Sequence, residues 1–429
     1  MENLIAGLEM LARWDVVPYQ TFAGLFSVGV VAFHMNGIDR VEFSVDGGPW
    51  AAVTEMTLNP RTGVVEYWAT LDAELFAADG QVEVRAVAYP ASSGIPRVLA
   101  GAINGLRANA GEYSLILSAN HGQTLPALVR YVDPNGSNAT GDGTRAKPYA
   151  TMMKAARSIQ DEQGGNADGG TIYLLPGDHT YGIYEPAFFT ITENQWLTIA
   201  PDPLSIPESI QITAATSGGL RTKLVRIKDL RIRPLNSTTT LPTNSVLEDY
   251  YWISGCDFVG RGNTVDESWL NGWSKGFVTD TKISNCRDGI AGDIVRNAEV
   301  FDIGSDAYSG AFLLVNCFAH DFDFGDSAFH ADVWQFSAGP GNVIENNIAY
   351  NVRSRTNVGQ GFFAGANRPT KDTAFVDCDI SNQEGSNPTV AFAFQFLSPT
   401  EHMYVLRSRF VGSASWRTSM GFTAKNVVV

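Results

Sequence analysis

The residues best suited to acid–base chemistry lie between positions 320 and 336. This segment holds two of the six histidines, and His330 is followed by Asp332, Trp334 and Gln335, with apolar residues between the first three. Alternate residues of a strand share a face, so His330, Asp332 and Trp334 are predicted to face outward together. Polar groups beside an aromatic ring are suited to binding a sugar.

These residues lie within a repeat that must position them. Short strand-like segments recur, and their equivalent positions are 30 or 31 residues apart: Cys256, Cys286, Cys317, Asn347, Cys378 and Ser408. This regularity predicts a solenoid of about nine or ten turns, in which equivalent residues stack about 4.8 Å apart. The four cysteines are then predicted to be free thiols in a buried stack, and a disulfide between Cys256 and Cys286 is the alternative.

The repeat also predicts a second carboxylate beside Asp332. Asp302 lies 15 residues before Cys317 and Asp332 lies 15 before Asn347, so the two are expected on adjacent turns, and Asn271 extends the row. Two carboxylates about 5 Å apart cannot both ionise without cost, so one is expected to have a raised pKa and to act as an acid. Alternatively, the pair holds a calcium ion. No other cofactor is indicated.

Two reactions fit these residues. A lyase acting on a uronic-acid chain needs a base and a cation that neutralises the sugar carboxylate, and His330 or Arg353 would take these roles. In a hydrolase, Asp302 and Asp332 would be the acid and the base. The residues predicted to contact the substrate are Trp334, Gln335, Asp306, Asn271 and Arg355. In the structural alternative, Asp, Asn and His at solenoid corners serve turns and side-chain ladders.

The start of the repeat region resembles a known fold family. The segment 131–151, the helical pattern at 149–161 and the apolar strand at 171–175 resemble the entry segment of pectate-lyase-like proteins, which are right-handed parallel β-helices. This resemblance implies that a short helix caps the open end of the solenoid. The His-x-Asp-x-x-Gln pattern at 330–335 resembles a motif of β-helix proteins that act on polysaccharides, which implies a polysaccharide partner.

The region before the repeat has a different pattern. Short strands with alternating apolar positions are separated by turn signals such as Asp46-Gly47-Gly48, and the stretches 41–50 and 80–90 resemble Ig-like modules. We therefore predict an all-β chain: an N-terminal segment (1–22), an Ig-like β-sandwich (23–125), and a right-handed single-stranded parallel β-helix with a short N-terminal capping helix (126–429).

The composition and the two ends of the chain indicate where the protein acts and what it binds. A net charge of −15 argues against binding nucleic acid, and the absence of an uncharged apolar stretch of about 18 residues argues against membrane insertion. The start lacks the basic region of a signal peptide, so either the signal was removed or export happens another way, such as release of virions by lysis. In both cases we expect an extracellular or a virion-associated location. Residues 421–429 fall on a predicted strand without a cap. Either the chain is truncated there, or this uncapped C-terminal edge is covered by a partner subunit in a homo-oligomer.

Two functions remain open. The first is depolymerisation of an extended polysaccharide, by a lyase rather than a glycoside hydrolase. The second is a non-catalytic virion or cell-surface adhesin, such as a phage tailspike or fibre. Both imply recognition of an extended glycan.

Overall fold

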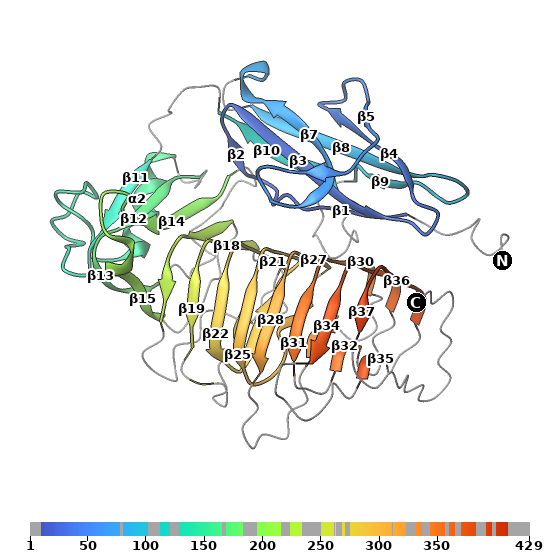
Figure 1. Ribbon diagram of the computed structural model, residues 1–429. Coiled ribbons are helices and arrows are strands. Elements are labelled where there is room, and N and C mark those ends of the chain that lie inside the picture. Colours follow the sequence, from blue (N-terminus) through green and yellow to red (C-terminus); the bar gives the residue numbers. More distant parts are fainter. Residues whose placement is uncertain are drawn as a thin grey trace.

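The protein is almost entirely β-structure, with a compact N-terminal part lying along one side of an elongated solenoid (Figure 1). The computed structural model describes residues 10–77, 80–101, 112–120, 128–164, 169–182, 195–215, 224–233, 250–260, 262, 268–270, 275–310, 312–322, 332–336, 344–356, 360–364, 370–382, 392–396 and 400–410.

The N-terminal part is a β-sandwich of two mainly antiparallel sheets. One sheet has the strand order β1-β3-β7-β6: Leu11–Trp14, Leu25–Phe33, Val65–Asp72 and Thr57–Leu58. The other has the order β2-β10-β8-β4-β5, and β9 also pairs with β8: Thr21–Phe22, Leu115–Ala119, Gln81–Pro90, Ile38–Val45, Ala51–Val53 and Arg97–Leu99. A short 3-10 helix, η1 (Ala73–Leu75), follows β7. Both β1 and β2 lie within residues 1–22, so the described part of that segment belongs to the sandwich.

The rest of the described chain forms three parallel sheets, as a right-handed parallel β-helix requires. Sheet A has eleven strands, β11, β12, β14, β16, β18, β21, β24, β27, β30, β33 and β36: Val129–Val132, Thr171–Leu174, Leu197–Pro201, Val225–Lys228, Tyr250–Ser254, Lys275–Thr279, Ile294–Arg296, Leu313–Val315, Ile344–Tyr350, Thr370–Val376 and Thr400–Leu406.

Sheet B has ten strands, β13, β15, β17, β19, β22, β25, β28, β31, β34 and β37: Gly177–Tyr181, Ile210–Ala215, Arg231–Ile232, Asp257–Val259, Lys282–Cys286, Glu299–Ile303, Phe318–Phe322, Arg353–Thr356, Asp379–Asn382 and Arg409–Phe410. Sheet C has six, β20, β23, β26, β29, β32 and β35: Ser268–Leu270, Asp288–Ala291, Tyr308–Ser309, Asp332–Phe336, Gln360–Ala364 and Phe392–Phe396. A second 3-10 helix, η2 (Pro207–Ser209), precedes β15.

A single α-helix among the described residues, α2 (Met152–Glu162), confirms the predicted capping helix. The Thr151 hydroxyl caps its start by accepting a hydrogen bond from the Lys154 backbone N–H. Its buried residues follow helical spacing on one side: Met152, Ala155, Ala156 and Ile159. No helix in the described part of the chain is long and apolar enough to cross a membrane.

Stacked apolar rows fill the solenoid interior. Register partners on successive sheet A strands form one fully buried row: Ile227, Ile253, Val278, Val295, Leu314, Ala349 and Phe375. Burying each large apolar side chain stabilises the fold by about 1.5–3 kcal/mol. Toward the C-terminal end the interior becomes aromatic, and the rings of Phe362 and Phe375 lie 4.3 Å apart between centroids. These rows hold the three sheets together.

The turn from sheet A to sheet B is the most regular feature of the solenoid. From β16 onward, two residues separate the strands, and the first has a positive φ of 48–65° at every turn: Asp229, Gly255, Asp280, Asn297, Asn316, Asn351, Asp377 and Arg407. Asparagine and aspartate adopt this left-handed conformation more readily than most residues. The amide of Asn351 also donates to Asn316 Oδ1 (2.8 Å), and that of Asn316 donates to Asn297 Oδ1 (3.2 Å). We call the eight positive-φ residues named above the turn ladder.

The cysteines are free and buried, which confirms one prediction and contradicts the disulfide alternative. The predicted register, however, was wrong. Cys256, Cys317 and Cys378 each follow a residue of the turn ladder, but Thr281, Ala298 and Val352 occupy the same position on other turns. Cys286 instead ends β22 and pairs with Ile303, and Asn347 pairs with Thr373 inside β30. Equivalent positions are 17 residues apart from Thr281 to Ala298 and 35 apart from Cys317 to Val352.

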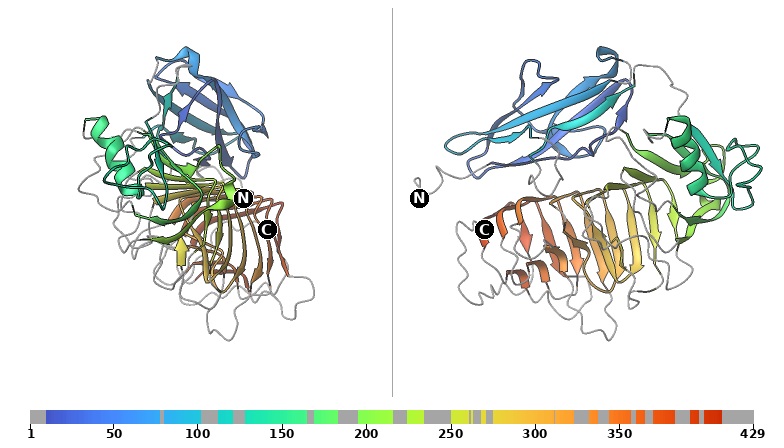
Figure 2. Two further views of the ribbon diagram at one scale, coloured as in Figure 1. Left: turned by 90° about the vertical axis from the view of Figure 1, so that its left-hand side faces the viewer. Right: turned by 180° about the vertical axis from the view of Figure 1, so that it is seen from behind.

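The sandwich packs on the outer face of sheet A, as Figures 1 and 2 both show. The Asn346 side chain of β30 accepts from Ala12 N (3.1 Å) and donates to Ala12 O (2.9 Å). Trp196 Nε1 donates to Pro18 O at 2.7 Å. The rings of Phe33 and Tyr404 lie 5.4 Å apart. The contacts run along most of sheet A, so this face of the solenoid is covered.

Candidate functional site

The structure separates the two carboxylates that the sequence placed together. Asp302 lies in β25 of sheet B, whereas Asp332 begins β29 of sheet C. The prediction that they are neighbours on adjacent turns was therefore wrong. The turn that runs from Ala298 to Cys317 has only 19 residues, so an offset of 30 residues does not identify neighbours here. His330 and Asn271 lie outside the described residues.

Asp332 does have an acidic neighbour, which is Asp306. The backbone N–H of Ala307 donates to Asp332 O (2.9 Å), and that of Gly289 donates to Asp306 O (2.8 Å). Asp288, Asp306 and Asp332 thus occupy the same position on successive turns of the solenoid, about 4.8 Å apart between backbones. Asp288 and Asp332 begin β23 and β29, and Asp306 lies two residues before β26. The Asp332 N–H also donates to the carboxylate of Asp306, at 3.1 Å to Oδ1. We call these three residues the acidic row.

Burial and mutual repulsion set the proton affinity of the acidic row. Asp332 is completely buried, Asp288 is 8% exposed and Asp306 is partly exposed. Burial, followed by the charges of Asp332 and then Asp288, raises the pKa of Asp306 well above its usual range, although the hydrogen bond from the Asp332 N–H and then the charge of Arg287 oppose the shift. Asp306 is therefore the member of the row best placed to hold and transfer a proton.

Trp334 lies in the solenoid interior, contrary to the prediction that it faces outward. Its ring packs edge-on against Phe362 and Phe375, each 5.9 Å away between centroids. Phe375 belongs to the interior row of sheet A, and Trp334 itself is completely buried. Asp332, also completely buried, is not on an open face either. Gln335 is partly exposed, and its backbone carbonyl accepts from Gly310 N at 3.0 Å.

The predicted arginines are on a different sheet from the acidic row. Arg353 and Arg355 lie in β31 of sheet B. Arg353 is exposed, and Arg355 Nη2 is 3.1 Å from Asp379 Oδ2. The structure therefore does not place these cations in the same row as Asp306 and Asp332.

The other histidine of the 320–336 segment, to which the sequence analysis gave no role, lies on the same sheet B surface. His320 stacks on Phe301 at 5.2 Å with 4° between the ring planes, and on Phe318 at 4.5 Å. Its ring nitrogens lie 3.2 Å from Glu299 Oε1 and 2.7 Å from Asp321 Oδ2. Because the rings turn their faces to one another, this group is a stabilising side-chain ladder rather than an open sugar platform.

Within the described ranges, no group of three or more His, Cys, Asp and Glu side chains has an arrangement that could hold a metal ion. The calcium alternative stays a prediction.

The fold defines a right-handed parallel β-helix protein that carries an N-terminal β-sandwich. No family model and no curated protein matches the chain. Among solved structures, it is similar to the family 28 exopolygalacturonase of Yersinia enterocolitica, with a TM-score of 0.33 and 10% sequence identity, over 96% of this chain and 97% of that one. The fold assignment rests on the strand pairing described above rather than on this similarity.

Proposed function

We propose that the protein binds an extended polysaccharide and cleaves it at the acidic row, with Asp306 as the proton donor. The observation that carries this proposal is the stacking of Asp306 beside Asp332 on adjacent turns of the solenoid, one partly exposed and the other buried. A polysaccharide substrate fits an extracellular or virion-associated location, which belongs to the same proposal.

The two carboxyl groups have different roles in this proposal. Asp332 is completely buried, so its contribution is electrostatic: repulsion between the two carboxyl groups makes the pair retain a proton at higher pH than an isolated aspartate does. Protonated Asp306 would donate to the glycosidic oxygen as the bond to the leaving sugar breaks. The water oxygen would bond to the anomeric carbon in place of the leaving sugar, and ionised Asp306 would accept the proton that this water loses.

The proposal is hydrolysis rather than the lyase reaction favoured by the sequence, because the arginine proposed for the lyase is not on the sheet of the acidic row. Elimination from a uronic-acid chain needs a cation beside the sugar carboxylate. Arg353, which was proposed with His330 for that reaction, lies on sheet B, as does the predicted substrate contact Arg355, whereas the acidic row lies on sheet C. The proposal therefore places bond cleavage at Asp306 without assigning a role in catalysis to either arginine.

A second candidate is a non-catalytic adhesin. The observation that favours it is the complete burial of the Asp332 side chain, because aspartates at a solenoid corner also serve structural ladders. In this case the stacked rows and the side-chain ladders would make the solenoid a rigid rod that binds glycan without cutting it.

The test is a panel of neutral and uronic-acid polysaccharides, followed both by new reducing ends and by ultraviolet absorbance of unsaturated products. Reducing ends without absorbance support the hydrolase. Unsaturated products would instead establish the lyase. Binding to a polysaccharide without any product would favour the adhesin.

A further inference from the structure

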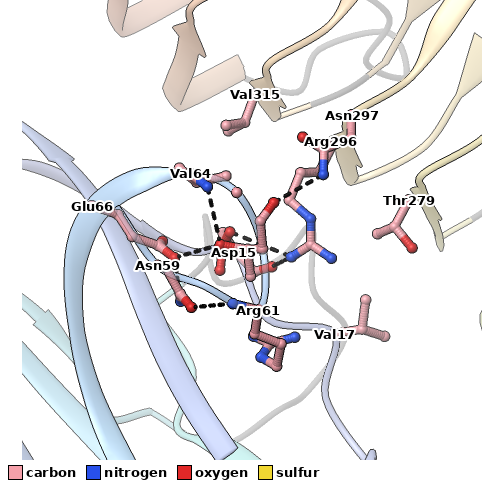
Figure 3. A network of polar contacts seen from close by, with 12 residues as sticks. Asp15, Val17, Asn59, Arg61, Val64, Glu66, Thr279, Arg296, Asn297 and Val315 are labelled. Atoms are coloured by element: carbon pink, nitrogen blue, oxygen red, sulfur yellow. Dashed lines mark hydrogen bonds and ion pairs between the residues drawn. The ribbon is translucent and has the colours of Figure 1, made fainter. Parts of the chain in front are cut away.

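A charged network lies buried where the sandwich meets sheet A (Figure 3). Asp15, which follows β1, is completely buried, and Arg296 at the end of β24 is 5% exposed. Arg296 Nη1 donates to the backbone oxygen of Asp15 at 2.9 Å and lies 3.4 Å from its Oδ2. A cation of the solenoid thus binds both the main chain and the side chain of one sandwich residue.

A second carboxyl group, Glu66 on β7, lies in the same network. It is completely buried, and its Oε1 accepts hydrogen bonds from Asn59 Nδ2 (2.7 Å) and Thr62 Oγ1 (3.0 Å). The position of the Glu66 side chain requires glycine at position 29 of β3, since a Cβ atom on Gly29 would lie 2.2 Å from the Glu66 carboxyl atoms. Any side chain at position 29 would therefore displace this group.

Charged side chains from both the sandwich and the solenoid surround Glu66. The sandwich supplies Asp15 and Arg61, and the solenoid supplies Arg296 and Asp280. Arg61 is itself held by a hydrogen bond from its Nε to Ser27 O (2.9 Å). The network therefore contains carboxyl groups and guanidinium groups from both sides of the interface.

Two oxygens of this network lack a hydrogen-bond donor within the described residues: Glu66 Oε2 and Asp15 Oδ1. If both carboxyl groups were charged, each would leave a buried acceptor unsatisfied at low dielectric. A proton on Glu66 removes one of these charges and supplies a donor. Burial, followed by the charge of Asp15, also raises the pKa of Glu66 well above its usual range.

We propose that Glu66 holds a proton that keeps the sandwich docked on sheet A, so that docking weakens as the pH rises. The proton binds more tightly in the docked state than in a solvated one. The stabilisation is therefore complete below the ordinary glutamate pKa of about 4.3 and is lost as pH rises through the raised pKa of the docked state.

Hydrogen exchange of the full-length protein between pH 5 and 8 tests this proposal, with rates corrected for the intrinsic pH dependence of exchange. Interface peptides, such as 10–17 and 290–300, should lose protection about tenfold per pH unit between the two pKa values, because one proton is released on opening. Glu66→Gln, which is neutral at every pH, should keep its protection throughout. Glu42→Gln is the matched control: Glu42 pairs with Arg40 at 2.7 Å on the sandwich surface, and its variant should keep the wild-type pH dependence.

Protection of wild type that does not change with pH would overturn the proposal, and so would a Glu66→Gln variant with the wild-type dependence. If Glu66→Gln does not fold, Asp15→Asn replaces it. Removing the charge of Asp15 lowers the proton affinity of Glu66, so the loss of protection should be complete at a lower pH than in wild type. An unchanged range would contradict the proposal.

Discussion

The acidic row places three aspartates at one position of successive turns, and Asp306 is the one with both solvent access and an acidic neighbour on the adjacent turn. Its raised pKa means that its protonated form persists to higher pH than that of an ordinary aspartate. In the proposed hydrolysis this form is the active one. Activity should therefore fall as pH rises through the pKa of Asp306, well above pH 4.

The burial of the thiols predicts that they react slowly in the folded protein. Burial raises the pKa of Cys256, Cys317 and Cys378 to about 12. Because the thiolate is the reactive form, the native protein at pH 8 should leave these three residues unmodified by iodoacetamide, and the urea-unfolded protein should be alkylated at all of them. Mass spectrometry of digested samples checks this. Modification of the native protein at the rate of free cysteine would contradict the burial described here.

At the scale of elements, the turn ladder joins sheet A to sheet B and also holds the sandwich. Asn316 has a φ of 51°, and its amide donates to Gly63 O (3.0 Å) as well as to Asn297. Asn316→Ala should destabilise the protein by about 2–4 kcal/mol, since it loses hydrogen bonds and places alanine in a left-handed conformation.

Urea unfolding measures this change, and Asn316→Gly separates its two parts. Glycine adopts a left-handed conformation without strain, so this variant should lose only the hydrogen bonds, about 1–2 kcal/mol. Equal stability of the alanine and glycine variants would show that the backbone conformation of the turn contributes nothing.

The turn ladder also explains which parts of the fold could be predicted. The recurrence of strand-like segments predicted a solenoid, and the resemblance of residues 131–175 to the entry segment of pectate-lyase-like proteins implied its parallel strands and its capping helix. The register does not follow from the sequence, because Asn285-Cys286 has the same pattern as Asn316-Cys317: a left-handed residue followed by a buried cysteine. Asn285 nevertheless lies inside β22 rather than in a turn.

The neighbour of Asp332 was predicted wrongly for the same reason. A coupled pair of carboxyl groups is present, but the partner of Asp332 is Asp306 rather than Asp302. The connections to and from sheet C differ in length from turn to turn, so a fixed period cannot align residues across them. The alternation around Asp332 and Trp334 correctly placed both side chains on one face of the strand. It did not show that this face is buried, because residue types alone do not distinguish an interior face from an open one.

At the scale of the whole molecule, the sandwich and the solenoid form one packed unit. Arg296→Ala would leave Asp15 buried without its cation, so we expect a loss of about 3–5 kcal/mol in the free energy of unfolding. Arg407→Ala is the matched control, because Arg407 pairs with Asp377 at the surface (2.7 Å) and should cost at most about 1 kcal/mol. Urea unfolding measures both, and equal losses would contradict a buried interdomain ion pair.

The covered face of sheet A also limits where a polysaccharide can bind. Arg296 and Asn346 contact the sandwich from this face, so a glycan cannot lie along it while the sandwich is docked. Sheets B and C remain, and the acidic row is on sheet C. The interdomain packing and the proposed site are therefore compatible.

The most direct test of the central claim compares Asp306→Asn with Asp302→Asn on the first polysaccharide that the panel shows to be cleaved. We predict that Asp306→Asn lowers kcat/KM by about 10²–10⁴-fold and abolishes the alkaline fall in activity. Asp302→Asn, at a left-handed position on sheet B that asparagine adopts readily, should keep the wild-type rate and pH profile. A wild-type rate in Asp306→Asn, or an equal loss in Asp302→Asn, would contradict the assignment of the acidic row as the site of cleavage.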